Sequence, residues 1–333
     1  MFSWSVMAAE TIPLIERPET NDFIQHMIKK HRFNETELTS WLKDAKIQPQ
    51  IIQSMSKPAE GLPWYKYKNI FLKDSRIQAG VEFWKNNKDV LAAAHKKYGV
   101  PEEIIIAILG VETYYGKYAG KDRVIDSLVT LSFDYPPRSK FFKSELEQFL
   151  LLSREEKWDP TVIKGSYAGA MGQPQFISSS YRHYAVDFNK NGKRDLLNSI
   201  EDSIGSIANY FKRSGWQKNE PVVFPATVSG EAYKNIKTSR SSPKPTYNLK
   251  EMEKSGITLK EGVPADKKLM KEKFALVSLE EKNETEHWLA LQNFYVITRY
   301  NRSSLYAMAV HELSQSIKTA YNSSNAETDS SNI

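Results

Sequence analysis

The sequence predicts an α+β fold that is mainly helical. Apolar residues recur at three- and four-residue spacing in residues 12–97 and 101–216, as amphipathic helices require. Between residues 220 and 292, short β-branched runs alternate with Pro- and Ser-rich segments, which predicts a few strands. A hydrophobic content of 40% and an aromatic content of 12% in 333 residues are typical of a globular protein and exclude a membrane bundle or a disordered chain.

The residue counts exclude several kinds of chemistry. The chain has no cysteine, which excludes thiol catalysis, iron–sulfur clusters, Cys-ligated zinc and a lipidated cysteine. Its six histidines show no HExxH or other close pairing, so we expect no zinc site. A net charge of +6 suits an anionic partner, such as nucleic acid, a membrane surface or an acidic cell-wall polymer. The basic residues are spread along the chain, so we predict no nucleic-acid partner.

Both ends of the chain have a distinct composition. Residues 1–10, MFSWSVMAAE, contain a short apolar run that ends in small residues. We interpret them as a signal-peptide remnant, which predicts export, with an ordinary frayed terminus as the alternative. Residues 323–333 are polar and predict a disordered tail. No other apolar run approaches about 18 residues, so we predict that the chain does not span a membrane.

Four segments lie between these ends. They are an N-terminal α-helical domain at residues 11–97, a second helical unit at 98–219, a small β subdomain at 220–292, and a strand and helix returning to the core at 293–322. Gly61-Leu62-Pro63 interrupts the first helical pattern and precedes an aromatic-rich stretch. Pro101 opens the second helical unit, which contains most of the candidate chemistry.

The strongest catalytic candidate is Glu112, which follows a long apolar run. On a helix it shares one stripe with Ile105 and Ile108, seven and four residues before it. Burial and the negative end of the helix dipole both disfavour the carboxylate anion, so we expect a raised pKa and an acid able to donate a proton. The alternative is a glutamate that pairs with Lys117 or Arg123.

Two stretches offer groups that suit sugar hydroxyls. Tyr114 and Tyr115 follow Glu112 by two and three residues and combine an aromatic face with a hydroxyl. Residues 164–176 have closely spaced Gly and Ala, where backbone can approach a ligand, and supply the neutral side chains of Ser166, Gln173 and Gln175. A tight structural turn is the alternative for this segment.

Residues 187–195, DFNKNGKRD, match the start of a calcium-binding loop. Oxygen ligands alternate, and glycine stands at the sixth position, where such loops turn sharply. The twelfth position is Asn198, so the closing carboxylate would come from Glu201 or Asp202. We predict a structural calcium or sodium ion in residues 187–202, with a solvated turn as the alternative. The candidate ligands are Asp187, Asn189, Asn191, Lys193 and Asp202.

Five motifs follow one another along the chain: GVETYYG, LSFDYPPRSKFFKSELEQFLL, KGSYAGAMGQPQFISSSYRHYAVDFNKNGKRDL, IGSIANYFKRSGW and NFYVITRYNRSSLYAMAV. Together they resemble the lytic murein transglycosylase B family of bacterial cell-wall enzymes, from about residue 67 to residue 313. The resemblance implies a lysozyme-like helical core with an EF-hand-like loop, an N-terminal α domain and a small β domain. It also implies non-hydrolytic cleavage of the β-1,4 bond between N-acetylmuramic acid and N-acetylglucosamine, which leaves a 1,6-anhydromuramoyl end.

The same resemblance implies roles for individual residues. It makes Glu112 the single catalytic acid and base. It places nine residues along the glycan: Tyr67, Arg138, Phe141, Ser166, Met171, Gln175, Tyr210, Tyr300 and Asn301. Two departures from the family pattern concern the stem-peptide contacts and the loop at Gln175. Pro137 replaces the first arginine of a pair, and GQPQF replaces GYGQF.

The resemblance also implies partners and a location. Since the chain has no cysteine to carry a lipid, it resembles the soluble periplasmic form. We expect a monomer that acts on peptidoglycan glycan strands and is a candidate member of cell-wall synthesis or remodelling complexes. The reaction itself requires no cofactor.

A single carboxylate can perform this reaction. Glu112 would protonate the glycosidic oxygen and then deprotonate the muramoyl 6-hydroxyl as it attacks its own anomeric carbon. A hydrolytic muramidase normally needs a second acid. The nearest sequence candidates for it are Asp122, Asp126 and Asp134. That enzyme and a catalytically weak murein-binding protein are the alternative functions.

Overall fold

The computed structural model describes residues 12–55, 61–263 and 266–330, and the predicted signal-peptide remnant lies outside them. Contacts divide the described residues into two units: unit 1 is residues 12–55, 120–171 and 176–182, and unit 2 is residues 61–119, 172–175, 183–263 and 266–330. These units do not follow the consecutive ranges expected from the sequence. A hydrophobic pattern indicates which residues are buried but not which distant segment covers them.

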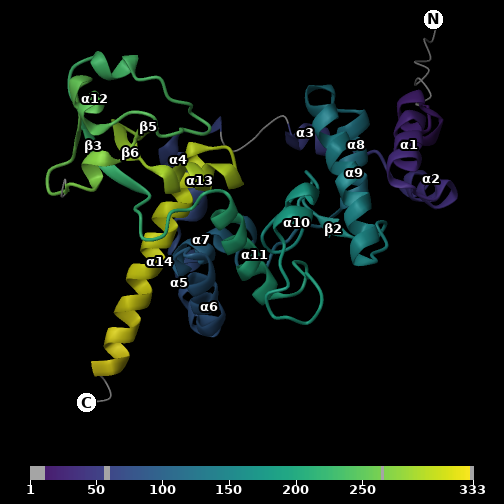
Figure 1. The fold of residues 1–333 in the computed structure, drawn as a ribbon, viewed down its shortest axis with the longest axis horizontal. Coiled ribbons are helices and arrows are strands. Elements are labelled where there is room, and N and C mark those ends of the chain that lie inside the picture. Colours follow the sequence, from purple (N-terminus) through teal and green to yellow (C-terminus); the bar gives the residue numbers. More distant parts are fainter. Residues whose placement is uncertain (1–11, 56–60, 264–265, 331–333) are drawn as a thin grey trace, which may run out of the picture. The chain divides into compact units, whose positions relative to one another are not determined.

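Unit 1 is built mainly of helices (Figure 1). Its elements are η1 (Leu14–Glu16), α1 (Pro18–His31), α2 (Glu35–Asp44), α3 (Pro49–Met55), β1 (Asp122–Arg123), α8 (Val124–Phe133), η3 (Pro136–Arg138), α9 (Ser139–Glu156), β2 (Lys164–Gly165) and the start of α10 (Ser178–Tyr184). The Asn34 side chain caps α2 by accepting the Glu37 N–H at 2.9 Å. An ion pair of 2.5 Å joins Arg17 to Asp134.

Unit 2 combines a helical core with a small sheet. Its helices are α4 (Trp64–Phe71), α5 (Asp74–Asn86), α6 (Lys88–Tyr98), α7 (Glu102–Thr113), α11 (Ile200–Arg213), α13 (Gln292–Tyr300) and α14 (Ser304–Ser330). The sheet segment contains β3 (Val223–Val228), η4 (Ala232–Asn235), α12 (Leu249–Lys254), β4 (Ile257–Leu259), η5 (Leu269–Lys271), β5 (Ala275–Glu280) and β6 (Thr285–Ala290). The strand order is β4-β3-β6-β5, antiparallel throughout, with Ala290 opposite both Val223 and Ala275.

Two segments differ from the expected secondary structure. Residues 293–300, where we expected a strand, lie in helix α13. The short apolar run fits either element, and burial of Phe294 and Ile297, three residues apart, selects the helix. Helix α14 extends to Ser330, into the segment expected to be a disordered tail. Residues 318–330 contain no proline or glycine that would end the helix.

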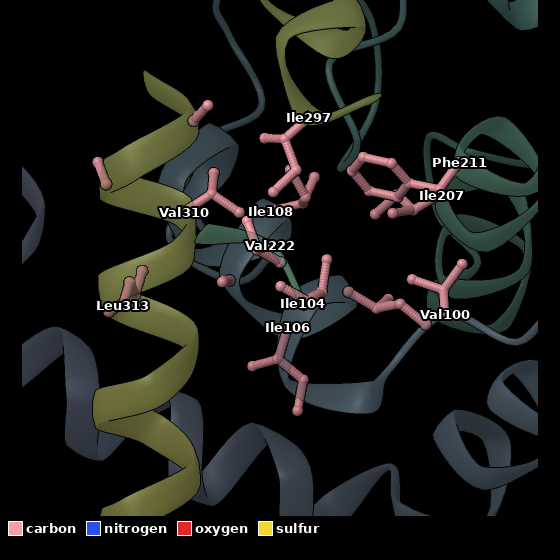
Figure 2. Close-up of a cluster of buried hydrophobic side chains, with 14 of the residues drawn as sticks. Val100, Ile104, Ile106, Ile108, Ile207, Phe211, Val222, Ile297, Val310 and Leu313 are labelled. Carbon is pink, nitrogen blue, oxygen red and sulfur yellow. The ribbon is translucent and has the colours of Figure 1, made fainter. Parts of the chain in front are cut away.

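Helix α7 lies at the centre of the unit 2 core. Its residues 104–109 are each at most 2% exposed, and a helix that is apolar on all sides must be enclosed. Helices α5, α6, α11 and α14 contact it. Figure 2 shows this packing through Ile104, Ile106 and Ile108 of α7, Ile207 and Phe211 of α11, and Val310 and Leu313 of α14. Burial of each such side chain contributes roughly 1.5–3 kcal/mol to the free energy of unfolding.

Helix α14 is the longest helix of the described residues, with 27 residues. It contacts α4, α5, α7 and α13. In the part of the chain that the structure describes, neither α14 nor any other helix has the length and apolar character needed to cross a membrane.

Glu312 of α14 makes folding stability depend on pH. Burial raises its pKa to about 7; Lys68 opposes the shift, and Glu286 and Glu281 add to it. The folded state therefore holds this proton more tightly than the unfolded chain, so stability falls as pH rises from about 4.5 to about 7. We expect Glu312→Gln to raise stability above pH 7 by roughly 1–2 kcal/mol, allowing for partial solvation.

Thermal unfolding of both proteins between pH 4.5 and pH 8 measures this difference. The extra stability of Glu312→Gln over the wild type should shrink toward zero as the pH approaches 4.5. Glu284→Gln, at an exposed position of the β5–β6 connection, is the matched control and should show no such trend. A pH-independent gain in Glu312→Gln would contradict the assignment to this proton.

Candidate active site

Glu112 lies in the last turn of α7 and is half-buried. Its Oε1 accepts a hydrogen bond of 2.5 Å from the hydroxyl of Tyr306, on α14. Tyr306 is 2% exposed. Burial, and then the charge of Glu112, raise the pKa of this phenol well above its usual value. The phenol is therefore neutral and donates to the carboxyl group at any physiological pH.

A row of aromatic rings continues from Tyr306. The Tyr300 ring is parallel to it, with centroids 6.5 Å apart, and stacks on Phe211 at 5.7 Å. Tyr210 meets Tyr300 edge-on at 4.9 Å. Burial raises the pKa of Tyr210 to about 12, and burial followed by the charge of Glu112 raises that of Tyr300. Two of the tyrosines expected at the glycan thus lie in one neutral cluster beside Glu112.

The turn after α7 is strained and firmly anchored. Tyr114 and Tyr115 have φ values of 52° and 61°, in the left-handed region, which costs of order 1 kcal/mol for each non-glycine residue. Their hydroxyls donate to consecutive carbonyls of α5, those of Ser75 at 3.1 Å and Arg76 at 2.7 Å. These bonds offset the strain and fix the end of α7 that carries Glu112.

Residues 172–175 form a loop held against the same helix end. Thr113 donates from Oγ1 to the Gln173 carbonyl at 2.9 Å, and the same Oγ1 accepts the Gly116 N–H at 2.9 Å. Gln175 donates from Nε2 to the Ala119 carbonyl at 3.0 Å. The buried Oε1 of Gln173 has no hydrogen-bond partner among the residues that the structure describes. The loop therefore presents an unused acceptor.

Two other expected residues of unit 2 are Tyr67 and Asn301, and Tyr67 is close enough to Tyr306 to add to the rise in the pKa of that phenol. Tyr67 is 2% exposed, and its ring contacts Trp64 at 6.4 Å and Phe71 at 5.3 Å. Asn301 is half-buried and follows α13 directly. In the structure, Tyr67 is mainly a core residue.

Four of the expected glycan residues belong to unit 1. Ser166 accepts the Ala170 N–H on its Oγ at 3.1 Å, as in a tight turn. Met171 is fully buried. The Arg138 guanidinium lies over the ring of Phe141 at 4.5 Å, and Phe141 is 37% exposed. Arg138 and Phe141 therefore present a cation and an aromatic face at the surface.

The basic residues considered as partners of Glu112 make other contacts. Lys117 lies over the Tyr118 ring at 5.6 Å, and Arg123 pairs with Asp44 at 2.5 Å. Among the candidates for a second acid, Asp134 binds Arg17, and Asp126 accepts the Lys46 N–H at 2.9 Å. Both of these aspartates therefore have structural roles within unit 1.

The loop of residues 187–202 is organised around Asp202, which is fully buried. Its two oxygens accept the N–H groups of Phe188 at 2.7 Å and Asp195 at 2.9 Å, so it joins both sides of the loop. Glu201 instead accepts from the Ser199 hydroxyl at 3.0 Å. At the start of the loop, Asp187 accepts the Gly192 N–H at 2.7 Å. The carboxylates of Asp187 and Asp202 therefore hold the loop by accepting its backbone N–H groups, and oxygen is the ligand atom that a hard cation such as Ca²⁺ prefers.

Sequence reasoning missed Tyr306 as a site residue. It lies 194 positions from Glu112, in a helix for which periodicity predicted an apolar face. No spacing rule relates two such residues, because the packing of α14 on α7 brings them together.

The chain is similar to several transglycosylases. Residues 16–315 match the family described as "Transglycosylase SLT domain". Over 314 residues it is 40% identical to the membrane-bound lytic murein transglycosylase B of Escherichia coli, covering 91% of this chain and 83% of that protein. The soluble lytic transglycosylase SltB1 of Pseudomonas aeruginosa is 42% identical, with a TM-score of 0.83 over 92% of this chain and 100% of that one.

Two further solved structures contain informative ligands. Escherichia coli Slt35 in complex with calcium is 39% identical, with a TM-score of 0.82 over 92% of this chain and 95% of that one. Pseudomonas aeruginosa SltB3 in complex with NAG-anhNAM-pentapeptide is 30% identical, with a TM-score of 0.77 over 90% of this chain and 79% of that one.

Gly110 of α7 provides a test of the anchored turn. A Cβ at this position would lie 2.8 Å from the Cζ and Oη atoms of Tyr115, and that hydroxyl is held by Arg76. We expect Gly110→Ala to displace the ring and lower the free energy of unfolding by roughly 1–2 kcal/mol, despite the better helix propensity of alanine. Thermal unfolding measures the loss.

Gly61→Ala is the control, because a Cβ there would contact nothing within 4 Å. Equal melting temperatures for the two variants would show that the Tyr115 ring is not tightly held.

Proposed function

The chain belongs to the transglycosylase SLT domain family and is a peptidoglycan lytic transglycosylase, and from this premise we propose that Glu112 is its single catalytic acid and base. The observation that carries the proposal is the hydrogen bond from a buried, neutral phenol to a half-buried carboxyl group at the end of a buried helix. Such surroundings suit a group that must both give and take a proton.

The proposed reaction has two proton transfers. First, the protonated Glu112 gives its proton to the glycosidic oxygen between MurNAc and GlcNAc, while the bond from that oxygen to the muramoyl C1 breaks. Then the carboxylate takes the proton of the muramoyl 6-hydroxyl, whose oxygen forms a bond to the same C1. The proton is returned to Glu112, no water is consumed and no cofactor enters. The product ends in 1,6-anhydromuramic acid.

Tyr306 is proposed to position the carboxyl group. Its hydroxyl donates to Oε1 whether Glu112 is charged or protonated, since that oxygen can accept in both states. We assign the transferable proton to Oε2. A fixed carboxyl group loses little orientational freedom as the transition state forms, which favours the reaction.

The proposed ligand is a peptidoglycan glycan strand. SltB3, to which the chain is 30% identical, has been solved with NAG-NAM-pentapeptide and with NAG-anhNAM-pentapeptide. We propose that the nine residues of the family pattern form the glycan site: Tyr67, Arg138, Phe141, Ser166, Met171, Gln175, Tyr210, Tyr300 and Asn301. Tyr67 and Met171 are buried, so their proposed part is to support the lining of the site. We also propose a periplasmic location, where this substrate occurs, and a monomer, since one chain supplies the proposed acid and base.

Glu112→Gln tests the catalytic assignment. Glutamine has nearly the same shape and keeps an oxygen that accepts from Tyr306, but it cannot transfer the proton. We expect turnover to fall by about 10³-fold or more while strand binding is kept. Mass spectrometry of digested peptidoglycan strands measures the products, and sedimentation with insoluble peptidoglycan measures binding.

Glu102→Gln, in the first turn of the same helix, is the matched control and should keep its activity. Its carboxylate accepts from the Trp84 indole, which glutamine can also do. The wild-type products should be one water lighter than reducing ends. Reducing ends would instead indicate a hydrolytic muramidase, and full turnover by Glu112→Gln would refute the role of Glu112.

We propose that residues 187–202 hold a structural calcium ion, with sodium as a weaker ligand. The candidate oxygen donors are those of Asp187, Asn189, Asn191, Lys193 and Asp202. The calcium complex of the related Slt35 supports the choice of ion. The Phe188 ring of the loop packs closely on Gly205 of α11, where an added Cβ would lie only 2.5 Å from it. Ion binding would therefore fix the loop against α11.

Calcium should raise the melting temperature of the wild-type protein, and Asp187→Asn should reduce this increase because it removes a charged ligand. Thermal unfolding with calcium and with a chelator measures the effect. Asp159→Asn is the control, because Asp159 also accepts hydrogen bonds within a turn, from Thr161, but lies outside the loop. The same calcium response in both variants would mean that the loop is a turn without an ion.

A further inference from the structure

A cluster of metal-ligating side chains in unit 1 includes none of the residues assigned to catalysis or to the glycan. Helix α1 carries His26 and His31, and helix α9 carries Glu147. His26 Nε2 lies 2.9 Å from Oε2 of Glu147, and His31 Nε2 lies 2.7 Å from Oε1. The sequence predicted no zinc site, because its histidines show no HExxH or other close pairing, and Glu147 is 116 residues from His31. The packing of α1 and α9 side chains brings these groups together.

We propose that His26, His31 and Glu147 form a binding site for a divalent transition metal, with zinc as the best match. The three ligand atoms lie within 4.8 Å of one another. Two imidazole nitrogens and one carboxylate are a common set of protein ligands for zinc, with a fourth position for water. The His26 and His31 rings are nearly perpendicular, at 78°, and both direct Nε2 at the same carboxylate.

His26 and His31 contact different oxygens of Glu147, so the carboxylate would bind the metal through both oxygens or turn one of them into the site. Zinc bonds of about 2.1 Å in a tetrahedral arrangement separate neighbouring ligand atoms by about 3.4 Å. The observed N–O separations of 2.7 and 2.9 Å would therefore open by roughly 0.5–0.7 Å. Each imidazole would carry its proton on Nδ1 and present the Nε2 lone pair to the metal. The bound ion would then link the end of α1 to α9.

Lys30 is the main competitor for this site. Its Nζ donates to Oε1 of Glu147 at 2.9 Å, on the same oxygen that His31 contacts. A carboxylate oxygen has two lone pairs, so the metal can replace the contact with His31 while Lys30 keeps its own. The Lys30 side chain is 56% exposed and can also turn into solvent. Its positive charge opposes a cation, so removal of this charge should tighten metal binding.

Calorimetric titration of the metal-free full chain with zinc chloride tests the proposal. We expect one zinc per chain, with a Kd in about the micromolar range. His26→Ala and His31→Ala should each weaken binding by roughly 100-fold or more, since even outer-shell changes at zinc sites cost 10–100-fold. Lys30→Gln should bind zinc as tightly as the wild type or more tightly.

Two further measurements separate metal binding from the ion pairs themselves. For each variant, the melting temperature with zinc is compared with that of the same variant without zinc. A loss of stability caused by the missing side chain itself therefore does not affect the comparison. His183→Ala, at an exposed histidine outside the cluster, is the matched control and should respond to zinc like the wild type. Absence of zinc binding in the wild type, or unchanged binding in both His26→Ala and His31→Ala, would overturn the proposal. Glycan cleavage plays no part in this test.

Discussion

The burial of helix α7 is the constraint on which the rest of unit 2 depends. Residues 104–109 offer no polar side chain to solvent, so other helices must cover every side of this helix. Glu112 lies where the apolar run ends and the core meets the surface. One of the helices that cover α7 is α14, which also carries Tyr306, whose phenol donates a hydrogen bond to the carboxyl group. The packing of α14 on α7 thus both covers the core and places the hydroxyl of Tyr306 on the carboxyl group proposed to transfer the proton.

The turn that follows α7 stores strain close to this carboxyl group. Two consecutive tyrosines adopt left-handed backbone conformations, and their hydroxyls are fixed to α5. Space for the second ring exists because α5 and α7 have glycines facing it, Gly80 and Gly110. A side chain at either glycine would occupy the volume of the Tyr115 ring or its hydroxyl. Residues that looked like sugar-binding aromatics from sequence therefore also have a structural role, which is to hold the end of α7.

Local patterns predicted some elements well and others poorly. The mainly helical α+β class is confirmed, because helical periodicity over long segments is a strong signal. Residues 293–300 were one of two exceptions, since a short β-branched run fits a strand or a buried helix and only burial in the core selects between them. The closing position of the 187–202 loop was left between Glu201 and Asp202 by sequence, and the backbone N–H groups that bind Asp202 identify it as the residue that joins the two sides.

The sequence by itself determined the family, the strongest candidate carboxyl group and its apolar helix, because each depends on residues close together in the chain. Only the tertiary structure decided which groups surround them. Tyr306 reaches Glu112 across 194 residues, and Glu147 reaches His31 across 116. Such pairs have no characteristic spacing, since their distance is set by how helices pack and not by helical repeat. The chemistry of individual residues was therefore readable from sequence, whereas the partners that hold them in place were not.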